Sequence, residues 1–562
     1  MNINKKFHIE YFVFVLSIFY LIFITNLYYP SVLSPDLHRY KTYLEYFFTD
    51  QTKIISEQGT LYYYIISIFV YLQINSIETS SPLNFTDLDN QINFRPEFLS
   101  ETELNFGLGI QNGNFIIYLI GLYGLFKILR IFNTEKHIAI FTLAFINILP
   151  ITFQLLVTMK PEIFGFALLI WIIYFIELYK ERGEKIYIFS SAIFLSVLLN
   201  TKASISAISL IIIFIQLLEN WRKLNLDIKS FTFGIITLVV FTFSINYENS
   251  KIVENNFLSR SNLNDIYDQP EYDNKAPANI LYNIDFKNLI YKPVKNYHAD
   301  SIIGITLLDN FGDYFNEYWN KDYTFFKKYS KNFIVSSDKV KFDLKNRILY
   351  QNFFSFELNN IRRLVSLFLS LLFYTFTFIT FFKKKGVPKF IILGPFIGII
   401  ILFINSLGIP ENNFDPLTGD LFKTYYYSFI FLISFTFVLR QYLIKNKKLI
   451  NFIFFLALLV LCLFILGFPM ANNSLLDRTL ENINSFTYFC EINKQVLKIT
   501  NIEYFKVKCV DHKFFNNFQN ISFVDNIKIN FYSILTIVAL IFIDLIKSYN
   551  VKDRFFKYLD KK

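Results

Sequence analysis

The chain has 562 residues, of which 53% are hydrophobic and 18% are charged, and this balance excludes an ordinary soluble enzyme of that length. The charged residues cluster between long apolar runs, which is typical of membrane helices. The formal net charge of +10 does not indicate a nucleic-acid partner. Cytoplasmic loops of membrane proteins collect Lys and Arg, and the sequence has no basic stripe with interleaved aromatic residues.

The apolar runs predict an all-α membrane protein with about twelve transmembrane helices. The first run follows Lys5 and Lys6 and has no small-residue cleavage site before Tyr29, so it is interpreted as an uncleaved first span. The predicted spans are 11–29, 114–132, 138–158, 162–179, 186–200, 202–219, 230–246, 362–383, 389–408, 424–441, 449–468 and 531–547.

One further apolar stretch, residues 61–74, is short for a span and decides the orientation of everything that follows. If this stretch does not cross, the short linkers rich in Lys and Arg all face the cytoplasm, and if it crosses, that bias inverts. The positive-inside rule therefore predicts a juxtamembrane helix that dips into or lies on the outer leaflet. Both chain termini are then cytoplasmic.

This orientation places the long polar segments on the extracytoplasmic side. The predicted organisation is a transmembrane core with its first outer loop (1–246, loop 30–113), a middle outer loop (247–361), further transmembrane helices (362–468), a third outer loop (469–530) and a last span with a cytoplasmic tail (531–562).

The cysteine and histidine pattern indicates no metal site, since the sequence has no CxxC motif and no His cluster with metal-ligand spacing. Cys490 and Cys509 both lie in the third outer loop. An oxidising compartment would permit a disulfide between them, and two unpaired thiols are the alternative.

Asp36 follows the first span closely, within the sequence Ser34–Tyr40 (SPDLHRY), so its carboxylate is expected near the outer membrane surface. There it could take a proton from an acceptor hydroxyl, with basic neighbours keeping it ionised. It could instead be the N-cap of the amphipathic stretch 37–48, a role that its position alone favours.

Two short outer linkers carry further candidates. Lys202 lies in a turn so short that its ammonium is expected at the outer interface, where it could hold a lipid phosphate or be a snorkelling side chain. In the linker 159–162, Glu162 could be a second catalytic acid or a favourable charge at a helix N-terminus after Pro161.

The middle outer loop holds the densest set of carboxylates, amides and aromatic residues, in 309–322. Such groups bind sugars, because aromatic faces stack on pyranose rings and carboxylates accept from hydroxyls. The alternative is an interfacial helix with Tyr and Trp at headgroup depth. The candidates are Asp309, Asp313, Tyr314 and Trp319, and the two aspartates would share a face in a helix.

These motifs, in this order and on this side of the membrane, resemble the GT-C class of glycosyltransferases. The nearest branch is that of the protein O-mannosyltransferases and the aminoarabinose transferases of lipid A. The resemblance covers about residues 1–220 and rests on the acidic motif 34–40, the juxtamembrane stretch 58–63, the basic-ended helix 114–132, Pro161-Glu162 and the element 199–202. It departs from the family pattern in having one carboxylate rather than an Asp-Glu pair in the acidic motif, and Glu in place of the more usual Asp in the linker.

The resemblance implies an inverting transfer of a sugar from a polyprenyl-phosphate donor to an envelope glycolipid, polysaccharide or protein at a bacterial inner (plasma) membrane. Asp36 would be the general base, Glu162 an accessory acid and Lys202 a phosphate-binding cation. Additional candidates are Arg39 and Lys160 for the donor phosphate, and His38 and Tyr62, with the middle-loop set, for the sugar and acceptor. No cofactor is required, although Asp36 and Glu162 could share a divalent metal.

Three rival hypotheses make different demands on the structure. A lipid-linked oligosaccharide flippase or exporter needs charged or broken helices along a path. A non-catalytic envelope assembly protein predicts that Asp36, Glu162 and Lys202 lie far apart. An O-antigen ligase or polymerase would need paired arginines in a large outer loop, whereas Arg362 and Arg363 stand at the start of a span.

Overall fold

The computed structural model describes the chain over 60–75, 101–147, 149–220, 228–252, 284–291, 301–310, 367–382, 388–406 and 424–443, together with residue 364 and some positions between 14 and 25. Every regular element within these ranges is a helix, which confirms the all-α prediction.

The helices are given in chain order with their bounds. They are α3 (Leu61–Asn75), α5 (Glu101–Ile131), α6 (Lys136–Asn147), α7 (Pro150–Val157), α8 (Glu162–Arg182), α9 (Lys185–Leu199), α10 (Ala203–Asn220), α11 (Ile228–Ile252), α13 (Phe286–Tyr291), α14 (Ile302–Asp309), α17 (Lys389–Ile392), α18 (Gly394–Ser406), the 3₁₀ helix η7 (Thr424–Tyr427) and α19 (Ser428–Leu443). An apolar helix, Leu367–Phe382, precedes α17.

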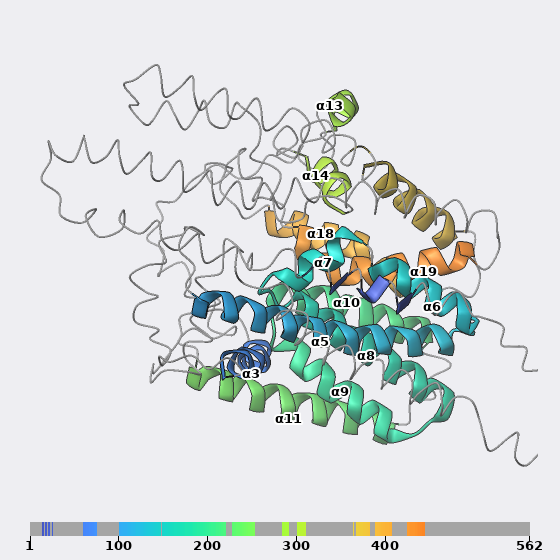
Figure 1. Ribbon diagram of the computed structural model, residues 1–562. Helices are drawn as coiled ribbons and strands as arrows, with labels where there is room; N and C mark the ends of the chain where they lie inside the picture. Colours follow the sequence, from blue (N-terminus) through green and yellow to red (C-terminus); the bar gives the residue numbers. More distant parts are fainter. Residues whose placement is uncertain are drawn as a thin grey trace, which may run out of the picture.

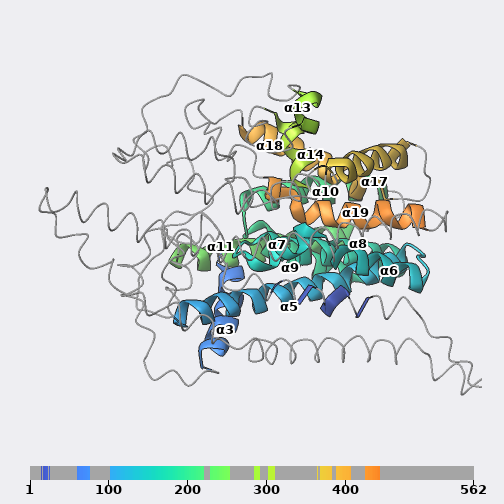
Figure 2. The same ribbon diagram turned by 45° about the horizontal axis from the view of Figure 1, so that its top comes forward.

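The bundle is built outward from α8 (Figures 1 and 2). α5 packs against both α3 and α8, α8 packs against α9, and α9 packs against α11. On another side, α19 contacts α6 and α8, and α10 contacts α17 and α18. The apolar window of α8 is 83% buried, whereas that of α11 is 17% buried. α8 is therefore an interior helix, and α11 lies at an edge of the described bundle.

Four described helices are long and apolar enough to cross a membrane: Gly109–Ile131, Glu162–Arg182, Ala203–Asn220 and Lys229–Glu248. They coincide with four of the predicted spans, and several shorter apolar helices accompany them. The protein is thus a multi-pass membrane protein, and the full number of about twelve spans stays a prediction. The stretch 61–74 forms the short helix α3.

The predicted span 138–158 is two helices, because the chain breaks between α6 and α7. Pro150 has no N–H to donate to the carbonyl of Ile146, so the helix cannot continue through it. That carbonyl accepts instead from the Thr152 hydroxyl at 2.8 Å and from the Leu149 N–H at 3.1 Å. The break therefore leaves this backbone group satisfied inside the bundle.

The predicted span 389–408 is also two helices, α17 and α18, and the cause is again a proline. Pro395 cannot donate to the carbonyl of Ile391, four residues earlier. The Ser434 hydroxyl of α19 donates to that carbonyl. A side chain of the neighbouring helix thus replaces the missing backbone bond.

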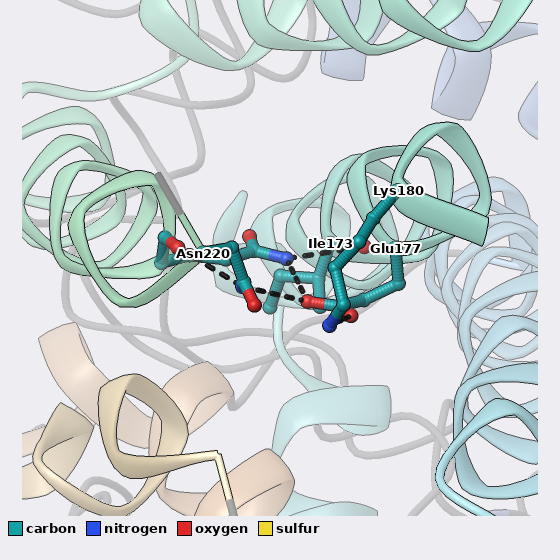
Figure 3. A network of polar contacts seen from close by, with 5 residues as sticks. Ile173, Glu177, Lys180 and Asn220 are labelled. Carbon is teal, nitrogen blue, oxygen red and sulfur yellow. Dashed lines mark hydrogen bonds and ion pairs between the residues drawn. The ribbon is translucent and has the colours of Figure 1, made fainter. Parts of the chain in front are cut away.

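A buried carboxylate joins α8 to α10 near the Lys180–Arg182 end of α8 (Figure 3). Glu177 is 1% exposed, and its Oε2 accepts from the Lys180 ammonium at 2.5 Å. Its Oε1 accepts from Gln216 Nε2 at 3.0 Å and from Asn220 Nδ2 at 3.2 Å, both on α10. The three donors satisfy the charge, so the carboxylate holds the two helices together.

We predict that Glu177→Leu lowers the stability of the protein by about 2–3 kcal/mol, because the amides of Gln216 and Asn220 lose a charged acceptor. Thermal unfolding of the detergent-purified protein measures the change. Glu181→Gln, on the exposed face of the same helix end, is the matched control and should leave the transition in place. Equal shifts for the two variants would contradict a structural role of the buried carboxylate.

Candidate active site

The first turn of α8 places a carboxylate inside the bundle. Pro161 is the N-cap residue, a position where the missing N–H is not needed, and Glu162 follows as the first helical residue. Glu162 is 0% exposed. The partial positive charge of the helix N-terminus favours an anion here, but a buried carboxylate also needs a cation or further donors.

The cation is Lys202, which stands immediately before α10. Its Nζ lies 2.5 Å from Glu162 Oε1, and its side chain is 10% exposed. Gly165 allows the two helices to approach beside this ion pair, because a Cβ there would lie 2.7 Å from Ile205 Cγ2. The other carboxylate oxygen of Glu162, Oε2, is buried and accepts no hydrogen bond within the described residues. This oxygen can therefore accept a hydrogen bond from a bound ligand.

Tyr62, at the start of α3, lies near Glu162 and links α3 to α5. The side chain is 0% exposed, and its hydroxyl donates to Asn114 Oδ1 of α5 at 2.8 Å. Asn114 Nδ2 in turn donates to the carbonyls of Thr158 at 2.7 Å and Leu156 at 3.1 Å. These bonds fix α3, α5 and the linker before α8 relative to one another.

The environment also keeps Tyr62 protonated. Burial, followed by the negative charge of Glu162, raises the pKa of the Tyr62 phenol well above its usual value. The phenol therefore acts as a hydrogen-bond donor near the carboxylate.

Lys160 lies in the same linker, two residues before α8, and is 2% exposed. Its N–H donates to the carbonyl of Thr158 at 3.0 Å. The side chain is buried in the linker that holds Asn114, and its role in binding the donor phosphate stays a prediction.

One residue of the site was missed by the sequence analysis. The ring of Tyr426, in η7, lies over the Lys202 ammonium, with the ring centroid 4.1 Å from Nζ. A cation within about 6 Å of an aromatic centroid is attracted to the ring face. The available sequence signal was the run of three tyrosines, 425–427, just before α19 and on the same expected side as Lys202.

The other predicted site residues cannot be placed with this cluster. Asp309 is the last residue of α14, and its side chain is not described. The candidates that lie outside the described residues are Asp36, His38, Arg39, Asp313, Tyr314, Trp319, Cys490 and Cys509. Within the described ranges, no group of three or more His, Cys, Asp or Glu side chains could hold a metal ion.

Residues 105–246 match the family model of the dolichyl-phosphate-mannose-protein mannosyltransferases. The matched range runs from α5 to α11 and contains Asn114, Lys160, Glu162 and Lys202. This is a family of GT-C membrane glycosyltransferases, so the match defines the class of the protein. No curated protein and no solved structure matches the chain.

Over these residues the chain is similar to the mannosyltransferase family, and the protein is a membrane glycosyltransferase that depends on a lipid-phosphate sugar. The resemblance found in the sequence is confirmed. The roles of individual residues stay predictions.

We predict that Glu162 and Lys202 are energetically coupled by about 1–3 kcal/mol. Each single variant, Glu162→Gln or Lys202→Met, leaves one polar group buried without its partner, whereas the double variant removes both. Thermal unfolding of the four proteins gives the coupling energy. The same cycle with Glu181→Gln, at the exposed end of α8, and Lys185→Met, at the start of α9, is the control and should be additive. Additivity of the Glu162 and Lys202 effects would show that the pair does not hold the helices together.

Proposed function

We propose that the protein transfers a sugar from a polyprenyl-phosphate donor to an acceptor on the extracytoplasmic face of a bacterial inner membrane, with inversion at the anomeric carbon. The family match supports a mannosyl donor. The observation that carries the proposal is the Glu162–Lys202 ion pair at the adjoining starts of α8 and α10. The acceptor would be an envelope glycolipid, a polysaccharide or a protein.

The chemistry needs one base, one cation and correct positioning. The acceptor hydroxyl attacks the anomeric carbon, and its proton passes to the carboxylate of Asp36. The bond between the anomeric carbon and the phosphate oxygen breaks, and the lipid phosphate leaves with the electron pair. Lys202 neutralises the leaving phosphate with the positive charge of its ammonium, which Glu162 Oε1 holds at the start of α10.

Glu162 would have two tasks in this scheme. Its Oε1 orients Lys202, and its Oε2 would accept from a hydroxyl of the sugar or the acceptor. A divalent metal shared by Asp36 and Glu162 is a variant of the same proposal.

The two ends of α8 support the proposed face. α8 runs over 21 residues from Glu162 to Arg182, and the exposed turn at its other end carries Arg182 and Lys185. A helix of that length rises about 30 Å, which matches the hydrocarbon core of a bilayer. Because short cationic turns stay in the cytoplasm, the Glu162 end belongs on the outer side.

The rival hypotheses explain the geometry less well. The broken helices and the buried Glu177 are features that a flippase would need. However, Thr152 and Ser434 fill the two breaks, and three donors satisfy Glu177, so these groups are used in packing. An assembly protein predicts that Glu162 and Lys202 lie far apart, whereas they form an ion pair.

We predict that Lys202→Met lowers transfer from radiolabelled polyprenyl-phosphate mannose at least 100-fold, because one preorganised charge contributes about 10²–10³-fold to such a step. Transfer is measured in membranes that contain equal amounts of each variant. Lys185→Met, at the start of α9 and beyond the opposite end of α8, is the matched control and should keep wild-type activity. Wild-type transfer by Lys202→Met would overturn the assignment of the phosphate site.

We predict that Asp36→Asn keeps donor binding but lowers transfer by about 10²–10⁴-fold, the usual contribution of a general base. Single-turnover transfer and binding of the same labelled donor are measured side by side. Unchanged transfer would make Asp36 a helix cap.

The proposed face can be tested by cysteine labelling in a background where the three native cysteines are serine. A membrane-impermeant maleimide added to spheroplasts should label Phe286→Cys, on the exposed helix α13, but not Glu184→Cys, in the α8–α9 turn. After lysis both should react. The reverse pattern would put the site on the cytoplasmic face.

A further inference from the structure

Tyr426 is part of the environment of Lys202, although the two residues are far apart in the chain. The Lys202 ammonium contacts the buried Glu162 carboxylate on one side and the Tyr426 ring face on another. A ring attracts an ammonium through its quadrupole and carries no net charge. Tyr426 can therefore restrain the lysine without cancelling the charge that a phosphate needs.

The 3₁₀ turn that carries Tyr426 is fixed by its next residue. Tyr427 is 0% exposed, and its hydroxyl donates to Asn310 Oδ1 at 3.1 Å. Gly398 of α18 leaves room for it, because a Cβ at that position would lie 2.4 Å from Tyr427 Cβ. Thus η7 is held by a hydrogen bond on one side and by close packing on the other.

Asn310 connects three elements. It is the C-cap residue of α14, is 0% exposed, and donates from Nδ2 to the Tyr374 hydroxyl at 2.7 Å. With the bond from Tyr427, it joins α14, η7 and the helix Leu367–Phe382. A buried amide with both partners in place defines the position of the groups around it.

We infer that Tyr426 orients the Lys202 ammonium for the phosphate of the lipid donor and that Asn310, through Tyr427, positions Tyr426. Tyr426 is thus a positioning residue for donor binding. Lysine has a flexible four-carbon stem, and fixing it costs rotamer entropy. Glu162 and Tyr426 restrain the ammonium before the donor arrives, which lowers that cost. This inference rests on the proposed role of Lys202 in phosphate binding.

The test measures binding of radiolabelled polyprenyl phosphate, which carries the phosphate but no sugar, to the purified full-length protein. Tyr426→Leu should weaken binding about 3–30-fold, the range expected for loss of a partly desolvated cation–π contact. Tyr426→Phe keeps the ring face and should bind within about twofold of wild type. The rescue by Phe is the result that a general structural role of Tyr426 would not give.

A matched control is available on α5, where the Lys127 ammonium lies 5.1 Å from the centroid of the Tyr123 ring. Tyr123→Leu removes an equivalent contact away from the site and should leave polyprenyl phosphate binding unchanged. Equal binding by Tyr426→Leu and wild type, or equal losses for Tyr426→Leu and Tyr426→Phe, would overturn the inference.

The link through Asn310 has its own variant. Tyr427→Phe removes one hydroxyl and keeps the packing, and it should weaken polyprenyl phosphate binding by a smaller factor than Tyr426→Leu. If Tyr426→Leu does not fold, this variant decides, and unchanged binding by Tyr427→Phe would overturn the inference.

The variant Lys202→Met separates the proposed phosphate site from the inference about Tyr426. If it still binds polyprenyl phosphate, the phosphate site itself is wrong. If it loses binding while Tyr426→Leu keeps it, only the inference about Tyr426 fails.

Discussion

A carboxylate buried at the start of a membrane helix needs a cation, and this requirement organises one end of the bundle. Glu162 obtains its cation from Lys202, which lies 40 residues further along the chain. The two side chains can meet only if α8 and α10 begin side by side, so α9 must return the chain across the bundle between them. At the other end of α8, Glu177 binds α10 again, and the same helix pair is thereby fixed at both ends.

The elements were more predictable than the contacts between them. Long apolar runs identify helices because lipid and core both exclude unsatisfied backbone, and α5, α8, α10 and α11 appeared near the expected places. The breaks before Pro150 and Pro395 were missed because hydropathy averages over a proline. At each break a carbonyl loses its backbone donor and accepts from a hydroxyl instead, that of Thr152 in one case and that of Ser434 in the other. Hydropathy does not show whether such a donor will lie within reach.

For the site, sequence order and membrane side selected Glu162 and Lys202, and the family pattern gave each a separate role. Their ion pair could not be predicted, because it depends on how closely Gly165 lets α8 and α10 approach. The contact between Tyr426 and Lys202 could not be predicted either, because it depends on how η7 packs against α10. The family match ends at residue 246, whereas Tyr426 and Asn310 lie beyond it. The part of the site that holds the charge pair is thus the part covered by the family, and the aromatic cover comes from outside it.

The separation of Glu162 from Lys202 along the chain has a consequence for biosynthesis. A ribosome adds about 5–20 residues per second, so the 40 residues between them take about 2–8 s to make. During that interval α8 has entered the membrane or the insertion machinery without its cation. The carboxylate must then stay hydrated or protonated until α10 arrives. The buried carboxylate of Glu162 therefore obtains its counter-charge only when α10 has been inserted beside α8.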